Sequence, residues 1–414
     1  MSVFFKNNEP FLEGVPINDL IDSYSTPFYV YSQSEIIKNY NNLKNHLSAE
    51  IFYAVKANSN QAILKLLNNC GSGADVVSKG ELYRSLQAGF EPNKIIFEGV
   101  GKSKEDIEYA VSKNIRLINT ESISEISIIN EIGDKLNKKI NIGLRLNPDI
   151  DSETYSKIST GKKTDKFGIA IKDLNDVLTK IKSFKQINLI GISCHIGSQI
   201  KDINIFEKVF NIMKNSASIC LSKGIRLEFV DLGGGFGVNY EKATNDLDIE
   251  AIGKLSKSIF NDELYNLSFE PGRYIVAKAG IIITKILTIK ENGGINFLIT
   301  DSGMQTLLRP AIYGAVHRIQ SLKNLENKEL VYTVAGPICE SSDIIAKDIL
   351  LPEQKIENYL AILDVGAYGS VMASNYNSRG MPTEILVNEK NFAAIHIGEK
   401  ITDIVKGDII PEWL

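Results

Sequence analysis

The sequence lacks the features that direct a chain into a membrane or an oxidising compartment. No apolar run is long enough to cross a bilayer, and Met1–Pro10 carry charge without the apolar core of a signal peptide. Only four cysteines occur, Cys70, Cys194, Cys220 and Cys339, and their spacing matches no metal site. We therefore expect a cytoplasmic protein with reduced thiols, no bound metal and no membrane partner.

The chain also has no excess of positive charge, since its formal net charge is −4. That balance gives no reason to expect nucleic acid or an anionic membrane as a partner. Internal repeats, low-complexity tracts and a flexible linker are missing as well. Because 414 residues exceed what one hydrophobic core usually holds, two domains are expected.

Strand-like runs alternate with amphipathic helical segments between residues 51 and 270. Eight strands alternating with helices over this length are typical of a (β/α)₈ barrel, and an open, doubly wound sheet is the competing arrangement. The predicted helical segments include Gln61–Asn68, Lys79–Gln87, Ser103–Ser112 and Ile205–Ser222. The predicted strands are Ile51–Val55, Ala74–Val77, Lys94–Phe97, Arg116–Asn119, Ile140–Leu146, Leu189–Cys194, Leu227–Leu232 and Leu267–Glu270.

After residue 270 the pattern changes to short strands joined by Gly, Pro and Asn turns, which predicts a separate all-β domain. The early strand Pro27–Tyr31 could join it. The expected domains are therefore a barrel over residues 34–268 and a β domain that combines residues 1–33 with 269–414. The predicted strands of the β domain are Ile281–Ile289, Asn296–Ile299, Leu330–Ala335 and Tyr359–Leu363.

Lys56 follows the first predicted strand of the barrel, in the segment Ile51–Asn58. A barrel holds its active site where the C-terminal ends of its strands converge. An ammonium group is costly there, and a desolvated lysine becomes a nucleophile toward an aldehyde. The alternative is an ordinary strand-end lysine that reaches solvent.

Other reactive side chains fall at the ends of later strands. Asp75 lies on the second, Arg145 and Asn147 end the fifth, His195 follows the sixth and Glu270 ends the eighth. Because parallel strands of a barrel end on one face, we expect these side chains to share that face. Taken alone, His195 is better explained as a hydrogen-bonded core histidine.

The seventh strand runs into the glycine-rich segment Asp231–Gly237. Consecutive glycines let the backbone approach a phosphate and point several N–H groups at it. The segment lacks the lysine of a triphosphate-binding loop and the context of a dinucleotide fingerprint. Its place after the seventh strand, where barrels commonly hold a phosphate, favours a phosphate site over a tight turn.

Together these parts predict a site for pyridoxal phosphate on a barrel. Lys56 suits an imine with the aldehyde, and the glycines suit the phosphate. Glu270 can keep the pyridine nitrogen protonated, so that the ring accepts electrons. His195 could stack on the same ring.

Several segments along the chain form a recognisable set. They are Phe52–Asn58, Ile158–Gly161, Lys166–Gly168, His195–Gln199, Gly233–Gly237, Glu270–Arg273, Arg309–Pro310, Cys339–Asp343 and Gly366–Gly369. In them the sequence resembles the group IV, fold type III decarboxylases, and among these the diaminopimelate decarboxylases, essentially from end to end. The resemblance implies an alanine racemase-like architecture, a TIM-like barrel with a C-terminal β-sandwich or β-barrel domain. Tyr155 departs from the family, which often has histidine there, and this bears on the loop Asp149–Phe167.

The resemblance also implies a reaction, the decarboxylation of meso-2,6-diaminopimelate to L-lysine and CO₂ as the last step of lysine biosynthesis. Lys56 would form the internal Schiff base, His195 would stack on the pyridine ring, and Glu270 would pair with its nitrogen. Cys339 would protonate the carbanion left by CO₂. The active unit would be a homodimer in which Cys339, Glu340 and Tyr368 reach a site across the interface. The other implied contacts are Ser198, Gly234, Gly235, Gly272 and Arg273 around the phosphate or adjoining substrate, Arg309 and Tyr313 at the distal carboxylate, Glu340 at the distal ammonium group, and Tyr368 at cofactor and substrate together.

Each late residue also has an ordinary explanation. Cys339 could be a small buried apolar residue, and Arg309 a surface arginine. Arg273 could pair structurally with Glu270. Tyr313 and Tyr368 could simply pack at an interface.

Other activities are compatible with the same cofactor. Related decarboxylases act on ornithine, arginine or carboxynorspermidine, but Arg309 and Glu340 offer both charges that a diamino-dicarboxylic acid requires. A racemase needs an acid–base residue on each face of the carbanion, and no second one stands out. A non-catalytic regulatory or cofactor-carrier protein should have lost Lys56 or Cys339, and both are present.

Overall fold

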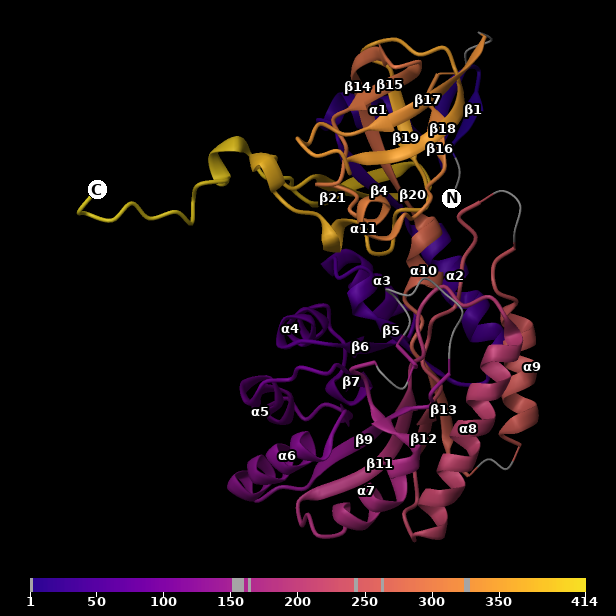
Figure 1. Cartoon of the computed structure of the whole chain (residues 1–414), viewed down its shortest axis with the longest axis vertical. Helices are drawn as coiled ribbons and strands as arrows, with labels where there is room; N and C mark the ends of the chain where they lie inside the picture. The colour runs from indigo at the N-terminus through magenta and orange to yellow at the C-terminus, as the bar shows by residue number, and fades with distance from the viewer. Residues whose placement is uncertain (1–2, 151–159, 163–164, 242–244, 262–263, 324–327) are drawn as a thin grey trace. The chain divides into compact units, whose positions relative to one another are not determined.

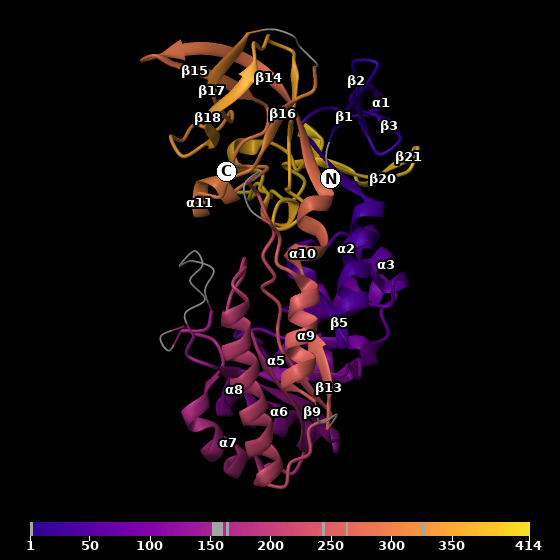
Figure 2. The same ribbon diagram turned by 90° about the vertical axis from the view of Figure 1, so that its right-hand side faces the viewer.

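The computed structural model describes residues 3–150, 160–162, 165–241, 245–261, 264–323 and 328–414, and the chain divides into two compact units (Figures 1 and 2). Unit 1 comprises Met1–Ile36, Asn239–Thr244 and Val276–Leu414. Unit 2 comprises Ile37–Val238 and Asn245–Ile275. Unit 2 extends past its last strand to Ile275. The end of this segment is bonded to the unit, because Asn39 Nδ2 donates to Ile275 O at 3.0 Å.

Unit 2 contains a closed barrel of eight parallel strands. The ring closes where the last strand pairs with the first, through Ser268 beside Glu50 and Phe269 beside Ile51. This closure confirms the predicted barrel, and the open doubly wound sheet is wrong. In ring order the strands are β5 (Glu50–Ala54), β6 (Gly73–Val76), β7 (Ile95–Phe97), β8 (Leu117–Thr120), β9 (Ile140–Asn147), β11 (Ile187–Cys194), β12 (Phe229–Asp231) and β13 (Asn266–Phe269). The short strand β10 (Ile169–Ala170) pairs with the end of β9.

Helices follow the strands around the outside of the barrel (Figures 1 and 2). Six of them begin at a residue whose side chain accepts a hydrogen bond from the first turn, namely Asn60, Ser78, Ser103, Ser122, Asp202 and Asp248. The helices are α2 (Gln33–His46), α3 (Gln61–Asn69), α4 (Lys79–Gln87), α5 (Lys104–Ser112), α6 (Ile123–Leu136), α7 (Leu174–Ile181), α8 (Ile203–Ser222) and α9 (Ile249–Ile259). Helices α3, α4, α5 and α8 match the four predicted segments. Across the described part of the chain, no helix combines the length and the apolar character needed to cross a membrane.

The barrel interior is packed at the end where its strands begin. Phe52 and Phe229 lie in one buried cluster, and glycines opposite them leave the space that their rings fill. A Cβ at Gly73 would lie 2.4 Å from Phe52 Cδ1, and one at Gly191 would lie 2.6 Å from Phe229 Cζ. Arg116 lies over both rings, with its Cζ 5.4 and 5.0 Å from the two centroids. The interior of the barrel is therefore filled at this end, which leaves the other end for a site inside the ring of strands.

Unit 1 is built on a β-sheet that includes a strand from the beginning of the chain. That strand, β4 (Phe28–Ser32), pairs with β14 (Gly280–Asn292) on one side and β20 (Thr383–Asn388) on the other. The prediction that the early strand joins the β domain is thus confirmed. The other strands of the sheet are β15 (Ile295–Thr300), β16 (Ile319–Ser321), β17 (Glu329–Ala335), β18 (Ile344–Pro352), β19 (Tyr359–Ile362) and β21 (Asn391–His396).

Several strands of unit 1 escaped prediction. Strand β18 pairs with β17 along most of its length, but its sequence carries charge in the middle and seven of its nine residues are partly or fully exposed. Such a strand shows weak alternation, so periodicity does not reveal it. The smaller elements of unit 1 are β1 (Phe4–Lys6), β2 (Glu9–Leu12), β3 (Val15–Pro16), α1 (Ile17–Ser23) and α11 (Arg309–Tyr313). The turn α10 (Arg273–Val276) joins unit 2 to unit 1.

Candidate active site

Lys56 lies where β5 leaves the barrel, on the short 3₁₀ turn η1 (Val55–Ala57). Its Nζ lies 2.8 Å from Asp75 Oδ2, at the end of the neighbouring strand β6. The lysine side chain is 32% exposed, whereas the aspartate side chain is fully buried. The ammonium group is thus held by a buried carboxylate at the mouth of the barrel, rather than reaching freely into solvent.

Buried carboxylates surround this ion pair. Asp75, Glu98, Asp231 and Glu270 are all at most 4% exposed, and each lies at or just after the C-terminal end of a different strand. Ser268 Oγ and the Gly233 N–H donate to Asp231, at 2.6 and 2.7 Å. Carboxylates are therefore concentrated at this end of the barrel, and their negative charge favours binding of a cationic group.

Arg145, near the end of β9, neutralises part of that negative charge. Its Nη1 lies 3.2 Å from Glu121 Oε1 and 3.4 Å from Glu98 Oε2. Its guanidinium also lies 4.8 Å from the ring centroid of Phe167. Burial is the largest single effect on the pKa of this arginine and lowers it. The nearby carboxylates, first Glu98 and then Glu121, together outweigh burial, so the pKa is raised. Arg145 therefore stays charged inside the barrel mouth.

Glu270, like Asp75, keeps one buried carboxylate oxygen without a hydrogen-bond partner among the described residues. In Glu270 this oxygen is Oε1. Burial, and then the charges of Asp231 and Asp75, raise the pKa of Glu270 well above its ordinary value. A protonated ring nitrogen placed against it would satisfy the oxygen and stabilise the carboxylate, so Glu270 fits the pyridine end of pyridoxal phosphate.

His195 follows β11 and presents a neutral ring. Its Nδ1 accepts a hydrogen bond from the Gly234 N–H at 3.3 Å. Burial, and then the positive charges of Lys56 and Arg145, lower the pKa of His195 well below its ordinary value. A neutral imidazole that is fixed through Nδ1 is suited to stacking on a flat cofactor ring.

The loops after β11, β12 and β13 approach one another more closely than side chains would permit. A Cβ at Gly234 would lie 2.2 Å from Glu270 O, and one at Gly235 would lie 2.3 Å from Gly197 O. Gly235 also has a φ of +84°, which favours glycine. Beside these loops, Arg273 Nε donates to Ser198 Oγ at 3.0 Å. Close backbone, a hydroxyl and a guanidinium together fit a phosphate group.

Gly272 brings the same region against the turn that carries Lys56. A Cβ at Gly272 would lie 2.8 Å from the Ala57 Cβ and 3.0 Å from the Ala54 Cβ. Glycine therefore permits the segment after β13 to pack on the lysine turn, and it ties the proposed phosphate and aldehyde ends of the site together.

The loop that follows β9 is anchored by Asn147. Its Nδ2 donates to Lys162 O at 3.0 Å and to Phe167 O at 3.1 Å. The Gly168 N–H donates to Glu121 Oε2 at 2.6 Å. Tyr155, where the family often has histidine, lies in residues 151–159, which are outside the described part of the chain. The effect of this difference on the loop therefore stays a prediction.

Three residues of this site were not singled out from the sequence: Glu98, Glu121 and Asp231, the last of which was noticed only as part of the glycine segment. Glu98 directly follows β7, and Glu121 directly follows β8. A systematic search for charged residues after every predicted strand would have found them, because strand ends of a barrel face the site.

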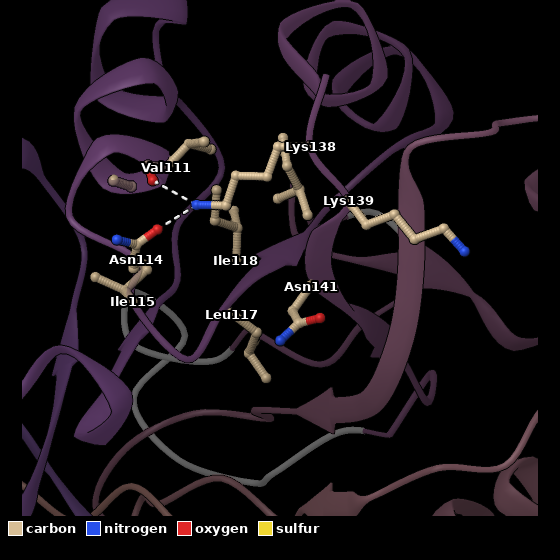
Figure 3. A pocket seen from close by; sticks show the side chains of 10 residues that line it. Val111, Asn114, Ile115, Leu117, Ile118, Lys138, Lys139 and Asn141 are labelled. Atoms are coloured by element: carbon tan, nitrogen blue, oxygen red, sulfur yellow. Dashed lines mark hydrogen bonds between the residues drawn. The ribbon is translucent and has the colours of Figure 1, made fainter. Parts of the chain in front are cut away.

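A pocket at the opposite end of the barrel is not part of this site. It lies where β8 and β9 begin, and Lys138 and Asn141 are among the residues that line it (Figure 3). Lys138 Nζ donates to Val111 O at 3.3 Å and to Asn114 Oδ1 (Figure 3). The Lys138 amine is thus engaged with the protein itself, which indicates a structural role for this lysine.

In unit 1, Arg309 begins the short helix α11 and is buried, with 6% exposure. Its Nη1 lies 2.9 Å from His317 Nε2, and its guanidinium lies 4.8 Å from the ring centroid of Tyr240. Burial contradicts the view of Arg309 as a surface arginine. Tyr313 ends the same helix and is half-buried.

Cys339 and Glu340 lie in an exposed turn of unit 1. Asp343 holds the turn, because its carboxylate accepts from the Met304 and Ile338 N–H groups at 2.6 and 2.7 Å. The explanation of Cys339 as a buried apolar residue is therefore wrong, since the residue is exposed. Hydrogen bonds from Tyr376 and then Ser342 lower the pKa of Glu340, so this carboxylate stays ionised.

Tyr368 occupies a strained position in the segment Gly366–Gly369. Its φ is +54°, in the region that side chains other than glycine seldom adopt. Hydrogen bonds hold the residues that follow. Ser370 Oγ lies 3.0 Å from the Tyr31 hydroxyl, which itself donates to Glu384 Oε2 at 2.6 Å. A buried network thus fixes the backbone that presents Tyr368.

Comparison with known proteins gives a consistent result. Residues 33–277 match the family described as pyridoxal-dependent decarboxylase, pyridoxal binding domain. A diaminopimelate decarboxylase of Aquifex aeolicus is 37% identical over 403 residues, covering 97% of this chain and 96% of the relative. The crystal structure of the Methanocaldococcus jannaschii diaminopimelate decarboxylase with L-lysine has a TM-score of 0.95 at 36% identity, covering 100% of this chain and 99% of that one. The Helicobacter pylori enzyme with L-lysine has a TM-score of 0.91 at 38% identity, covering 94% and 98%.

Proposed function

Because the chain belongs to the pyridoxal-dependent decarboxylase family, and within it to the diaminopimelate decarboxylases, we propose that it converts meso-2,6-diaminopimelate to L-lysine and CO₂. This reaction would be the last step of lysine biosynthesis. The observation that carries the proposal is the pairing of Lys56 with Asp75 at the barrel mouth, in the same ring of strand ends as the unsatisfied Glu270.

The barrel supplies the residues that would hold pyridoxal phosphate. Lys56 would bond to its aldehyde carbon, Glu270 would face its ring nitrogen, and His195 would lie against its ring. Ser198, Gly234, Gly235, Gly272 and Arg273 would surround its phosphate. When bound, the cofactor supplies an electron-accepting ring that takes up the electron pair left by departing CO₂.

Each barrel residue has a defined task in this proposal. Asp75 orients the Lys56 amine and balances its charge. Glu270 keeps a proton on the nitrogen opposite it, because a buried carboxylate strongly favours a cationic neighbour. Neutral His195 offers a flat surface without adding positive charge, as its lowered pKa supports.

The residues of unit 1 would recognise the far end of the substrate and complete the reaction. Arg309 and Tyr313 would hold the distal carboxylate, and ionised Glu340 would hold the distal ammonium group. Tyr368 would contact cofactor and substrate. The exposed thiol of Cys339 would donate the proton that replaces CO₂.

We propose further that the enzyme is a homodimer whose active sites use residues of both copies. Support comes from the C-terminal segment of unit 1, whose apolar side chains Ile397, Ile401, Val405, Ile409 and Trp413 are 62–89% exposed. So much exposed apolar surface is typical of an interaction site. A cytoplasmic location is proposed because all four cysteines are unpaired thiols, as a reducing compartment requires.

The proposal is tested by an absorbance scan of the purified protein followed by assay with meso-diaminopimelate, ornithine and arginine. We expect a cofactor band that shifts on addition of meso-diaminopimelate, with L-lysine and CO₂ released. Turnover of ornithine or arginine instead would move the assignment to a related decarboxylase. The absence of a band after incubation with pyridoxal phosphate would contradict the cofactor site itself.

Shared active sites are tested by mixing two inactive variants, Lys56→Ala and Cys339→Ala. If each site draws these residues from different copies, mixed dimers contain one intact site and the mixture regains activity. Sedimentation of the wild type should give a dimer. A mixture that stays inactive despite exchange of copies would contradict shared sites.

A further inference from the structure

His317 binds the guanidinium group of Arg309 through a hydrogen bond whose direction is determined by chemistry. It lies between α11 and β16 and is 2% exposed. Its Nδ1 lies 3.0 Å from Leu363 O, and its Nε2 lies 2.9 Å from Arg309 Nη1. A backbone carbonyl only accepts and a guanidinium only donates, so Nδ1 carries the proton and Nε2 accepts. His317 is therefore a neutral ring anchored to the backbone at one nitrogen and to Arg309 at the other.

Tyr240 adds a second constraint on the same guanidinium. Arg309 Cζ lies 4.8 Å from the Tyr240 ring centroid, and the Tyr240 and His317 rings meet edge to face at 5.4 Å. A guanidinium group is planar and carries its N–H donors in a rigid fork. One acceptor at a nitrogen and one aromatic ring over the cation together define the plane of that fork.

The acceptor also leaves the charge of Arg309 intact. The next arginine along the chain, Arg318, donates from Nε and Nη2 to Asp364 Oδ2 at 2.9 and 2.7 Å, so a carboxylate compensates its charge. His317 instead offers a neutral nitrogen. A neutral acceptor orients the fork without competing, through that contact, for a carboxylate ligand.

We propose that His317 is a positioning residue that orients Arg309 toward the distal carboxylate of the substrate, and so sets the preference for a diamino acid that carries this carboxylate over a plain diamine. The inference rests on the proposed function, in which Arg309 binds that carboxylate. It concerns binding of the far end of the ligand and not the chemistry at the reacting carbon. His317 therefore affects the affinity for carboxylate-bearing ligands through Arg309.

Two matched variants separate the two hydrogen bonds of the ring. In His317→Gln the longer side chain can place an oxygen where Nε2 was and still accept from Arg309. In His317→Asn the side-chain nitrogen can still donate to Leu363 O, but the side chain is too short to reach Arg309. The ligands are L-lysine and 1,5-diaminopentane, which has the same chain without the carboxylate, titrated into the cofactor-loaded protein.

We expect the wild type and His317→Gln to prefer L-lysine to 1,5-diaminopentane. In His317→Asn, the affinity for L-lysine should fall roughly tenfold to a hundredfold, as for a lost hydrogen bond to a charged group, while the affinity for 1,5-diaminopentane stays the same. The KM for meso-diaminopimelate should rise in parallel, with a much smaller change in kcat. With Arg309→Lys already in place, adding His317→Asn should have little further effect on L-lysine binding.

Other outcomes overturn the inference in distinguishable ways. An equal loss of affinity for both ligands in His317→Asn, or equal behaviour of the two His317 variants, would show a merely structural role. A wild type that prefers 1,5-diaminopentane to L-lysine would overturn the proposed function, and the role of His317 with it.

A measurement on the unmodified protein covers the case in which a variant does not fold. In ¹⁵N-histidine spectra of the wild type, only four histidines contribute, and His317 should be neutral with its proton on Nδ1. A proton on Nε2 would leave no acceptor for Arg309 and would overturn the inference.

Discussion

Lys56 Nζ lies 2.8 Å from Asp75 Oδ2, and the pair joins a one-third exposed lysine to a fully buried carboxylate. The two residues come from adjacent strands, β5 and β6, whose C-terminal ends form part of the barrel mouth. The carboxylate keeps the amine at one place while leaving it open to a ligand.

Replacement of Lys56 should abolish covalent attachment of the cofactor. Wild-type protein treated with pyridoxal phosphate and borohydride should gain the mass of one cofactor per chain, because reduction makes the bond to the lysine amine permanent. Lys56→Ala should gain none. Lys138→Ala, which removes a lysine from the opposite end of the barrel, is the matched control and should behave as wild type. Unchanged labelling of Lys56→Ala would place the reactive amine elsewhere.

Glu270→Gln tests the carboxylate at the ring nitrogen. Glutamine has the same shape but no negative charge, so it should retain the cofactor while turnover falls by about 10²–10³-fold, the usual effect of losing one charge-stabilising group. Glu250→Gln, on the exposed face of α9, should leave turnover unchanged. Normal turnover of Glu270→Gln would contradict its role at the nitrogen.

Cys339→Ala tests the proton donor. The variant should bind cofactor and L-lysine like the wild type, because Cys339 is exposed and its removal leaves no buried cavity. Turnover should fall by about 10²–10⁴-fold, the range for loss of a general acid. Cys70→Ala serves as the control for loss of an unrelated thiol. Turnover near the wild-type value would remove Cys339 from the mechanism.

Gly191→Ala tests the packing of the barrel interior. The added methyl group would lie 2.6 Å from Phe229 Cζ, and that ring is confined between the buried cluster and Arg116. The free energy of unfolding should fall by about 1–3 kcal/mol, as for other overpacked cores. Gly101→Ala, where a Cβ meets nothing within 4 Å, is the control. Equal denaturation midpoints for both variants would contradict the packing argument.

The dependence of stability on pH should contain a contribution from Glu81. Burial raises the pKa of Glu81 from its usual 4.5 to about 7. The folded protein therefore keeps this proton to higher pH than the unfolded chain, so the contribution is full below pH 4.5 and is lost as pH rises toward 7. The variant Glu81→Gln can still accept a hydrogen bond from the Val77 N–H, but it never ionises. It should therefore lack this pH-dependent contribution to stability.

The difference in unfolding free energy between wild type and Glu81→Gln should shift by on the order of 3 kcal/mol in favour of the variant between pH 4.5 and pH 7. Urea denaturation across that range measures it. A difference that does not change with pH would show that Glu81 titrates normally in the folded protein.

The alternation of strands and helices favours the barrel, because each strand of a parallel barrel is buried on both sides and reads as a short apolar run between turn signals. Strand β18 shows the limit of this reasoning. It contains Lys347 and Asp348, and it is stabilised by pairing with β17 rather than by burial of a continuous apolar face. Its existence depends on a neighbour that periodicity does not reveal.

The sequence by itself therefore determined the alternation of strands and helices and the placement of Lys56, His195 and Glu270 after their strands, since these follow from local patterns of burial and turn formation. Only the tertiary structure decided which charges meet. Glu98 and Glu121 reach Arg145 across three strands, and His317 reaches both Arg309 and Leu363 O. Distances between side chains far apart in the chain depend on how strands close into a ring or a sheet, and no local sequence pattern encodes that closure.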